Sequence, residues 1–189
     1  MKVCILAAGC GTRMNRYGEW IHKGLLPVRG QAVISHLVAQ FPKETEFVIA
    51  LGFRASQVRD YLLIAHPGRK VSFVEVGNFE GAGSGPGLSL LSCKAWLNEP
   101  FIFAASDGIF EFAGVPLHGN WIGVQKVADP EKWCSVETTS SGGVTAFHYK
   151  TKAPTHLAFT GIAAVHDHQA FWQGLEGDGR LARGELQVN

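Results

Sequence analysis

Short apolar runs alternate with amphipathic segments through the first two-thirds of the chain. Most of the runs are apolar at every position, which is typical of strands covered on both faces. The segments between them carry apolar residues at helical spacing, and the first ends before Pro42. This alternation predicts a mainly parallel sheet covered by helices on both faces. The expected strands are Val3–Leu6, Phe47–Leu51, Val71–Val76 and Phe101–Ala105, and the expected helices are Ala32–Phe41, Ser56–Ile64 and Leu88–Leu97.

Beyond residue 115 the pattern changes to strands joined by turns. The tract Ser140–Gly143 has the composition of a hairpin turn between two of these strands. Neither an internal repeat nor a linker-like stretch interrupts the sequence, so we expect one domain over residues 1–189. The expected strands of this half are Trp121–Val124, Cys134–Glu137, Val144–Tyr149 and His156–Val165.

A glycine-rich stretch follows the first expected strand directly. Gly9 and Gly11 allow backbone N–H groups to approach a phosphate closely. Met14 stands where a dinucleotide-binding G-x-G-x-x-G turn needs its third glycine, and the chain contains no G-x-x-x-x-G-K-[ST] loop. Arg13 and Lys23 add positive charge to the same place. The stretch therefore predicts a site for a phosphorylated ligand, most simply a nucleotide.

The run L-A-A-G-C-G-T-R-M at residues 6–14, followed by K-G-L-L-P-V at residues 23–28, resembles the signature of the sugar-phosphate nucleotidyltransferase superfamily. The resemblance implies a three-layer α/β/α, Rossmann-like fold of the GT-A type, with a mixed, mainly parallel sheet and a β-rich C-terminal half. It also implies that Arg13 stabilises the leaving pyrophosphate and that Lys23 neutralises charge on the α-phosphate. The residues that it places around the nucleotide here are Leu6, Ala7, Ala8, Gly9, Gly11 and Thr12.

Two further segments follow expected strands, at the edge where open α/β sheets bind ligands. Residues 78–87 contain four glycines, and Gly83, Ser84 and Gly85 look like a variant of the family's base-recognition loop. Because the variant departs from the usual G-T-A-G-x-L, the identity of the base stays open. The run S-D-G-I-F at residues 106–110 resembles the family's G-D-N-I-F motif, whose aspartate binds Mg²⁺. Asp107 is therefore the expected metal ligand, and carboxylate oxygen suits that cation.

The β-rich half resembles the family's acceptor-binding region. Glu137 would bind hydroxyl groups of the acceptor, and Thr160 and Gly161 match a T-G pair that contacts it. Lys150 is the expected partner of the acceptor phosphate, with Lys152 as the alternative. The chain is short relative to the family, whose later strand provides a second metal-binding aspartate; Asp178 is one substitute, although its sequence context does not match.

These motifs lead to two hypotheses about function. The first is a Mg²⁺-dependent nucleotidyltransferase of nucleotide-sugar biosynthesis, which moves NMP from an NTP to a sugar 1-phosphate or a similar small phosphorylated acceptor and releases pyrophosphate. The second is a catalytically weak nucleotide-binding or regulatory protein of the same fold, because the second carboxylate is not evident. Measuring pyrophosphate release alongside NTP binding would distinguish the two.

Composition adds limits on partners and location. The 189 residues carry a formal net charge of +1, so no basic footprint indicates a nucleic acid or an anionic membrane. We find neither a membrane-length apolar run nor a signal-peptide layout, and the four cysteines form no C-x-x-C, so a cytoplasmic protein is expected. A homo-oligomer stays open. His166, Asp167 and His168 are metal-ligating types, but as neighbours on a strand they would point to opposite faces.

Overall fold

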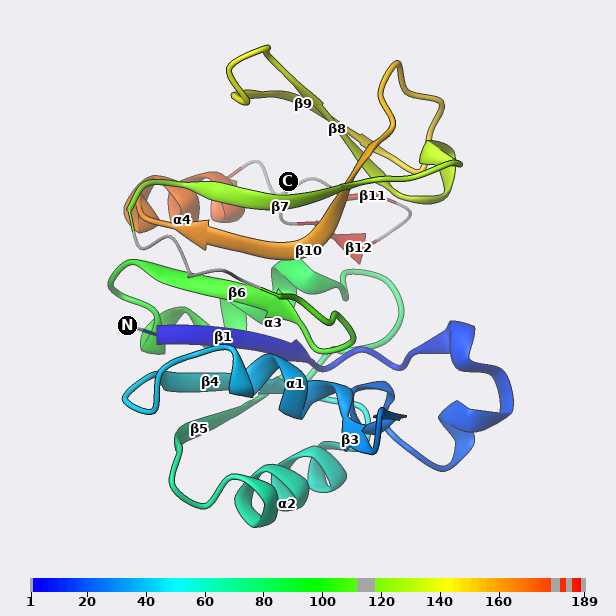
Figure 1. Cartoon of the computed structure of the whole chain (residues 1–189). Coiled ribbons are helices and arrows are strands. Elements are labelled where there is room, and N and C mark those ends of the chain that lie inside the picture. Colours follow the sequence, from blue (N-terminus) through cyan, green and yellow to red (C-terminus); the bar gives the residue numbers. More distant parts are fainter. Residues whose placement is uncertain (1, 112–117, 178–180, 183–184, 188–189) are drawn as a thin grey trace.

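The computed structural model describes residues 2–111, 118–177, 181–182 and 185–187. Its centre is an eight-stranded sheet in the order β5-β4-β1-β6-β10-β8-β9, with β7 paired to β10 (Figure 1). The strands of this sheet are β1 (Lys2–Ala7), β4 (Glu46–Leu51), β5 (Lys70–Glu75), β6 (Phe101–Ala105), β7 (Trp121–Lys126), β8 (Cys134–Thr138), β9 (Val144–Tyr149) and β10 (Leu157–Val165).

The parallel half of the sheet consists of the strands with the most continuous apolar runs. Strand β1 pairs in parallel with β4 on one side and β6 on the other, and β4 pairs in parallel with β5. Strand β10 runs antiparallel to β6, and the remaining pairs are antiparallel as well. The expectation of a mixed, mainly parallel core followed by a β-rich half is confirmed.

Helices cover both faces of the parallel strands. Helices α1 (Val33–Ala39) and α2 (Ala55–Ala65) pack on the face that carries Val3 and Ile5. On the opposite face, α3 (Pro86–Cys93) and α4 (His168–Gly177) pack against Cys4 and its neighbours. The alternation of faces along β1 thus separates two apolar clusters, and the three-layer expectation is confirmed. None of the helices in the described part of the chain is both long and apolar enough to cross a membrane.

Several short elements link or flank the sheet. All but one were not expected from the sequence; the exception, at Lys94–Trp96, is the end of the expected helix Leu88–Leu97. They lack a long hydrophobic period, and their conformation depends on contacts with distant parts of the chain. They are the 3-10 helices η1 (Thr12–Glu19), η2 (Lys23–Leu25), η3 (Lys94–Trp96) and η4 (Pro130–Lys132), and the strand pairs β2 (Pro27–Val28) with β3 (Gln31–Ala32) and β11 (Leu181–Ala182) with β12 (Glu185–Leu186).

Strand β10 changes partner at Gly161. Its second half pairs with β6 from Ile162 onward, whereas Ala158 in its first half pairs with β8. Strand β7 follows the other edge along both halves, with a register shift between Phe159 and Ala163. Strands β6 and β8 therefore pair with the same edge of β10, one after the other: β8 pairs with β10 beyond the point where β6 ends. This exchange brings the β8–β9 hairpin to the carboxyl end of β6.

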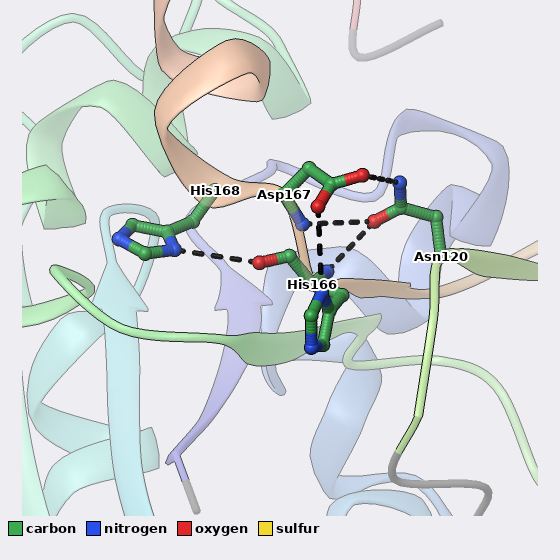
Figure 2. Close-up of polar contacts among 4 residues, drawn as sticks. All are labelled: Asn120, His166, Asp167 and His168. Atoms are coloured by element: carbon green, nitrogen blue, oxygen red, sulfur yellow. Dashed lines mark hydrogen bonds and ion pairs between the residues drawn. The ribbon is translucent and has the colours of Figure 1, made fainter.

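The turn between β10 and α4 corrects our expectation for the His166–Asp167–His168 run, which does not continue the strand. The Asn120 side-chain oxygen accepts from the backbone N–H groups of His166 (2.7 Å) and Asp167 (3.1 Å), and its amide nitrogen donates to the Asp167 carboxylate (Figure 2). The Asp167 carbonyl then accepts the N–H of Phe171. These contacts end the strand and start the helix. The turn lies at the sheet edge opposite the carboxyl end of β6, because Val165 pairs with Phe101.

Candidate active site

The carboxyl ends of β1 and β6 bring together the two charged residues that the sequence singled out. The Lys23 Nζ lies 3.0 Å from the Asp107 Oδ2, although the residues are 84 positions apart. The side chains are 21% and 47% exposed, so a ligand can reach both. Because β1 and β6 are parallel neighbours, the loops that follow them must meet at this edge.

The first loop, residues 8–25, leaves β1 at this edge and projects from the sheet (Figure 1). The Ala8 carbonyl accepts the N–H of Phe53, which fixes the start of the loop. Gly11 has a φ of 64°, and a Cβ there would lie 3.4 Å from the Lys23 Cδ. Glycine thus gives both the left-handed turn and room for the lysine stem. Gly9 faces open space, as a phosphate cradle requires.

The other residues that the motif assigns to the nucleotide lie at the end of β1 and at the start of η1. Leu6 and Ala7 end β1, and Ala7 is fully buried in the core. Thr12 and Arg13 are exposed at the start of η1, and Arg13 has no ion-pair or hydrogen-bond partner among the described residues. An exposed guanidinium without a protein partner is free to pair with a phosphate oxygen.

The glycine-rich segment has the backbone of a fixed loop. Gly83 and Gly85 have φ values of 80° and 122°, conformations that residues with a Cβ rarely adopt. The Ser84 hydroxyl is buried and donates to the Gly81 carbonyl at 2.7 Å, so it is used inside the loop. Gly85 then leads into α3, whose first residue is Pro86. A ligand here meets backbone groups more than side chains.

A strand from the end of the chain packs on this glycine-rich segment. The N–H of Leu186 in β12 donates to the Ser84 carbonyl at 2.7 Å. A Cβ on Gly87 would lie 2.6 Å from the Leu186 Cγ and 2.8 Å from the Gln187 carbonyl oxygen. Only glycine therefore fits at position 87, where β12 packs closely against the chain. The hydrogen bond from Leu186 to Ser84 holds the glycine-rich segment against β12.

We expect Gly87→Ala to lower the free energy of unfolding by about 1–3 kcal/mol, because the added methyl group overpacks the contact with β12. Urea denaturation of the full chain measures this loss. Gly77→Ala is the matched control, because a Cβ at Gly77 meets nothing within 4 Å. Equal stability of the two variants would show that the contact with Leu186 is loose.

Cys10 has charged neighbours from both the first loop and the glycine-rich segment. Burial and then the carboxylate of Glu80 raise the pKa of the Cys10 thiol, while a backbone hydrogen bond and the amine of Lys23 lower it. Glu80 belongs to the glycine-rich segment and Lys23 to the first loop. The three sequence segments therefore converge on one area at the carboxyl edge of the sheet.

His22 is a site residue to which the sequence gave no role. It is fully buried beside Lys23, and its Nδ1 accepts the N–H of Gly24 at 3.1 Å. Because Nδ1 accepts, the neutral ring carries its proton on Nε2. Burial, together with the positive charge of Lys23, lowers the pKa of His22 to about 4, against the raising effects of the Ala7 carbonyl and Asp107. The ring therefore stays neutral at pH 7.

This depressed pKa makes the fold sensitive to acid. Between pH 6.5 and pH 4 the unfolded chain binds a proton at His22 that the folded chain excludes. The free energy of unfolding is therefore highest above pH 6.5 and falls by up to about 3 kcal/mol as the pH drops to 4. In His22→Asn, whose side-chain oxygen can still accept from Gly24, we expect this part of the loss to disappear.

Urea denaturation at pH 7.5 and at pH 4.5 checks this expectation. The difference between the two pH values should shrink in His22→Asn and stay unchanged in His118→Asn, which alters an exposed histidine. An acid loss in His22→Asn as large as in the unmodified chain would assign the effect to other groups.

The acceptor residues predicted from the sequence lie along the β8–β9 hairpin and the switch in β10. The Glu137 Oε1 lies 2.6 Å from the His148 Nε2 across the hairpin. The Lys150 amine lies over the Tyr149 ring at 5.1 Å, and Lys152 is exposed. No contact in the described residues joins either lysine to Lys23 or Asp107, so the choice between them stays a prediction.

Thr160 and Gly161 form the switch itself. The Thr160 Oγ1 is buried without a hydrogen-bond partner among the described residues, against Gly123 of β7. Gly161 has a φ of 86°, and a Cβ there would lie 3.1 Å from the Ala105 Cβ at the end of β6. The pair thus adjoins the strand that leads to Asp107, and a role of these residues in acceptor binding stays a prediction.

The donor set at Asp107 suits Mg²⁺ bound together with a nucleotide. Mg²⁺ in nucleotide sites takes one or two carboxylates, phosphate oxygens and water. A half-exposed Asp107 beside a phosphate loop fits that pattern as the single protein carboxylate. In the described ranges no three His, Cys, Asp or Glu residues are grouped to hold a metal by themselves. Asp178, the substitute second ligand, lies outside the described residues.

Comparison with known proteins defines the class. Among solved structures, a UDP-glucose pyrophosphorylase complexed with UDP-glucose matches 99% of this chain and 83% of its own, with a TM-score of 0.79 and 20% identity. A putative glucose-1-phosphate thymidylyltransferase from Bacillus anthracis in complex with a sucrose matches 100% of this chain and 79% of its own, with a TM-score of 0.76 and 22% identity. The chain therefore shares its fold with these two proteins.

The family follows from the sequence comparison. A model of the MobA-like NTP transferase domain matches residues 3–111, more than half of the chain, and the chain belongs to this family. The family agrees with the nucleotidyltransferase class that the first-loop motif predicted. The match includes both Lys23 and Asp107.

The curated relatives are much longer than this chain. The bifunctional protein GlmU of Methanococcus vannielii is 26% identical over 140 residues, which cover 72% of this chain and 32% of the relative. GlmU of Methanococcus maripaludis strain C7 is 23% identical over 194 residues, covering 100% of this chain and 45% of the relative. The chain thus spans less than half the length of these relatives.

Proposed function

We propose that this chain transfers a nucleoside monophosphate from an NTP to a sugar 1-phosphate or a similar small phosphorylated acceptor, with release of pyrophosphate. The observation that carries the proposal is the 3.0 Å contact between Lys23 and Asp107. It joins a phosphate loop to a carboxylate at the sheet edge where α/β proteins bind nucleotides. A cation for phosphate and an anion for a metal are the charges that nucleotidyl transfer needs.

The reaction needs positioning and charge neutralisation more than covalent help from the protein. A phosphate oxygen of the acceptor attacks the α-phosphorus, and the bond from that phosphorus to the bridging oxygen of the β-phosphate breaks. The electron pair of that bond leaves with pyrophosphate. Lys23 neutralises charge that builds on the α-phosphate, and the exposed Arg13 pairs with the β- and γ-phosphates.

The other residues of the site bind and orient. The N–H groups of residues 8–12 would hold phosphate oxygens, and the turn at Gly11 leaves room for the Lys23 stem beside them. Asp107 would hold Mg²⁺, which when bound neutralises phosphate charge and orients the triphosphate. The backbone of Gly83–Gly85, fixed by β12, is proposed to face the base.

The acceptor is proposed to bind beneath the β8–β9 hairpin. The partner switch of β10 supports this placement, because it brings the hairpin to the carboxyl end of β6 and therefore toward Asp107. The Glu137–His148 pair offers polar groups to hydroxyls, and Lys150 or Lys152 offers charge to a phosphate. The complex of the related fold with UDP-glucose supports a nucleotide sugar as the product.

Pyrophosphate release measured with each common NTP, across a panel of sugar 1-phosphates and phosphocholine, tests the proposal. We expect release with at least one pair, and only in the presence of a divalent cation. Isothermal titration with the same NTPs runs in parallel. Measurable NTP binding without release for any pair would reject catalysis and leave the nucleotide-binding or regulatory protein.

A further inference from the structure

Helix α2 holds the first loop by a side chain that lies outside the phosphate site. The Gln57 Oε1 accepts the N–H of His22 at 3.0 Å, and its Nε2 donates to the Trp20 carbonyl at 2.9 Å. Both halves of the amide are thus used on the backbone of one turn. The contact joins segments 35 to 37 positions apart, so it ties the loop to the core through α2.

A second residue of the same helix end strengthens this attachment. The Arg54 guanidinium donates to the carbonyls of Gly18 (3.3 Å) and Glu19. Arg54 has a φ of 52°, a left-handed conformation that is unfavourable for residues with a Cβ. Its guanidinium also lies over the Phe53 ring. Four backbone groups between residues 18 and 22, three carbonyls and one N–H, are therefore held by Gln57 of α2 or by Arg54, which directly precedes α2.

The attachment ends next to Lys23. His22 is held by Gln57 through its N–H and binds Gly24 through its ring, so both neighbours of Lys23 are fixed. The Gly24 Cα also lies close to Ser106, since a Cβ there would be 3.1 Å from the Ser106 carbonyl oxygen. The backbone of Lys23 is thus clamped between α2 and the segment that carries Asp107.

We propose that Gln57 is a positioning residue for Lys23: through His22 it fixes the backbone from which the amine reaches the phosphate. The kinetic consequence rests on the proposed function, whereas the structural consequence does not. An amide suits this position because one of its atoms accepts and the other donates. Replacement of Gln57 leaves the Lys23 side chain unchanged, but the lysine is then free to move away from Asp107.

The test uses Gln57→Met, which keeps the length of the side chain and removes both hydrogen bonds, and Gln57→Ala. We expect kcat to fall about 10- to 100-fold in both, as displacement of a reacting group by about 1 Å does, while the KM for NTP changes little. Arg59→Ala is the matched control on the same helix, because Arg59 contacts Glu75 and Phe73 instead of the loop. It should keep kcat.

Two further measurements separate positioning from general damage. In a Lys23→Met background, adding Gln57→Met should reduce the residual rate less than about twofold, because Gln57 acts through Lys23. Hydrogen exchange of residues 18–24 should accelerate about 10-fold or more in Gln57→Met and stay unchanged in Arg59→Ala.

The exchange measurement needs no turnover, so it stands even if the proposed reaction fails. Faster exchange with no activity in the unmodified chain would reject the proposed function and keep the clamp. Unchanged exchange, unchanged kcat in both Gln57 variants, or a full additional loss in the Lys23→Met background would each overturn the positioning role.

Discussion

Lys23→Met should lower kcat/KM by about 100- to 1,000-fold, the range found when one preorganised charge-stabilising group is removed from an active site. Methionine keeps the stem that packs beside Gly11 and removes only the amine. Lys23→Ala should lose as much, which would show that the charge matters and the packing does not. Initial rates of pyrophosphate release at saturating acceptor measure the effect.

Stability should hardly change in these variants, because a half-exposed ion pair contributes at most about 1 kcal/mol. Lys2→Ala is a matched control: Lys2 and Glu99 have the same exposures, 21% and 47%, at the opposite end of β1. It should retain full activity. A Lys23→Met variant as active as Lys2→Ala would remove Lys23 from the site, and equal losses in both would indicate a defect in folding.

The parallel half of the sheet could be predicted because burial on both faces leaves a clear mark in the sequence. Phe101–Ala105 is apolar throughout, and β6 has those same bounds. Once the strands are parallel, the loops after β1 and β6 must meet, so the proximity of Lys23 and Asp107 also followed from the sequence. Their contact needed no long-range information beyond the order of the strands.

Helix α4 was missed although its signal was present. Ala170, Phe171, Trp172 and Leu175 have helical spacing, and Trp172 and Leu175 are buried against the sheet. The run His166–Asp167–His168 was interpreted instead as part of a strand. What starts the helix is Asn120, more than 40 positions earlier, and such a contact leaves no local mark.

The structural role of His22 could not be predicted for a similar reason. From its neighbours Ile21 and Lys23 alone, this histidine is interpreted as an ordinary loop residue. Its burial depends on packing against α2, which the local sequence does not show. The amide of Gln57 reaches it from 35 positions away. The change of partner strand at Gly161 likewise depends on how β6 and β8 are arranged in the whole sheet. Sequence motifs therefore identify the residues that bind or react, whereas the residues that hold them in position are identified only from tertiary contacts.

Asp107→Asn should lower kcat/KM by at least about 100-fold and raise the Mg²⁺ concentration for half-maximal rate, because one of the few ligand carboxylates becomes neutral. Asparagine keeps an oxygen that can accept from Lys23, so the amine stays near its present position. The loss then reports the charge on Asp107 instead of a displaced lysine. Glu99→Gln is the control, as Glu99 has the same 47% exposure and pairs with Lys2.

A binding measurement separates the metal role from other roles of this carboxylate. Titration of Mn²⁺ into the protein with a non-hydrolysable NTP analogue should give clearly weaker binding in Asp107→Asn than in Glu99→Gln. Lys23→Met should bind Mn²⁺ at least as well as the unmodified chain, because it frees Asp107 from its 3.0 Å partner. If Mn²⁺ affinity is equal in Asp107→Asn and Glu99→Gln while only Asp107→Asn loses rate, a different group binds the metal.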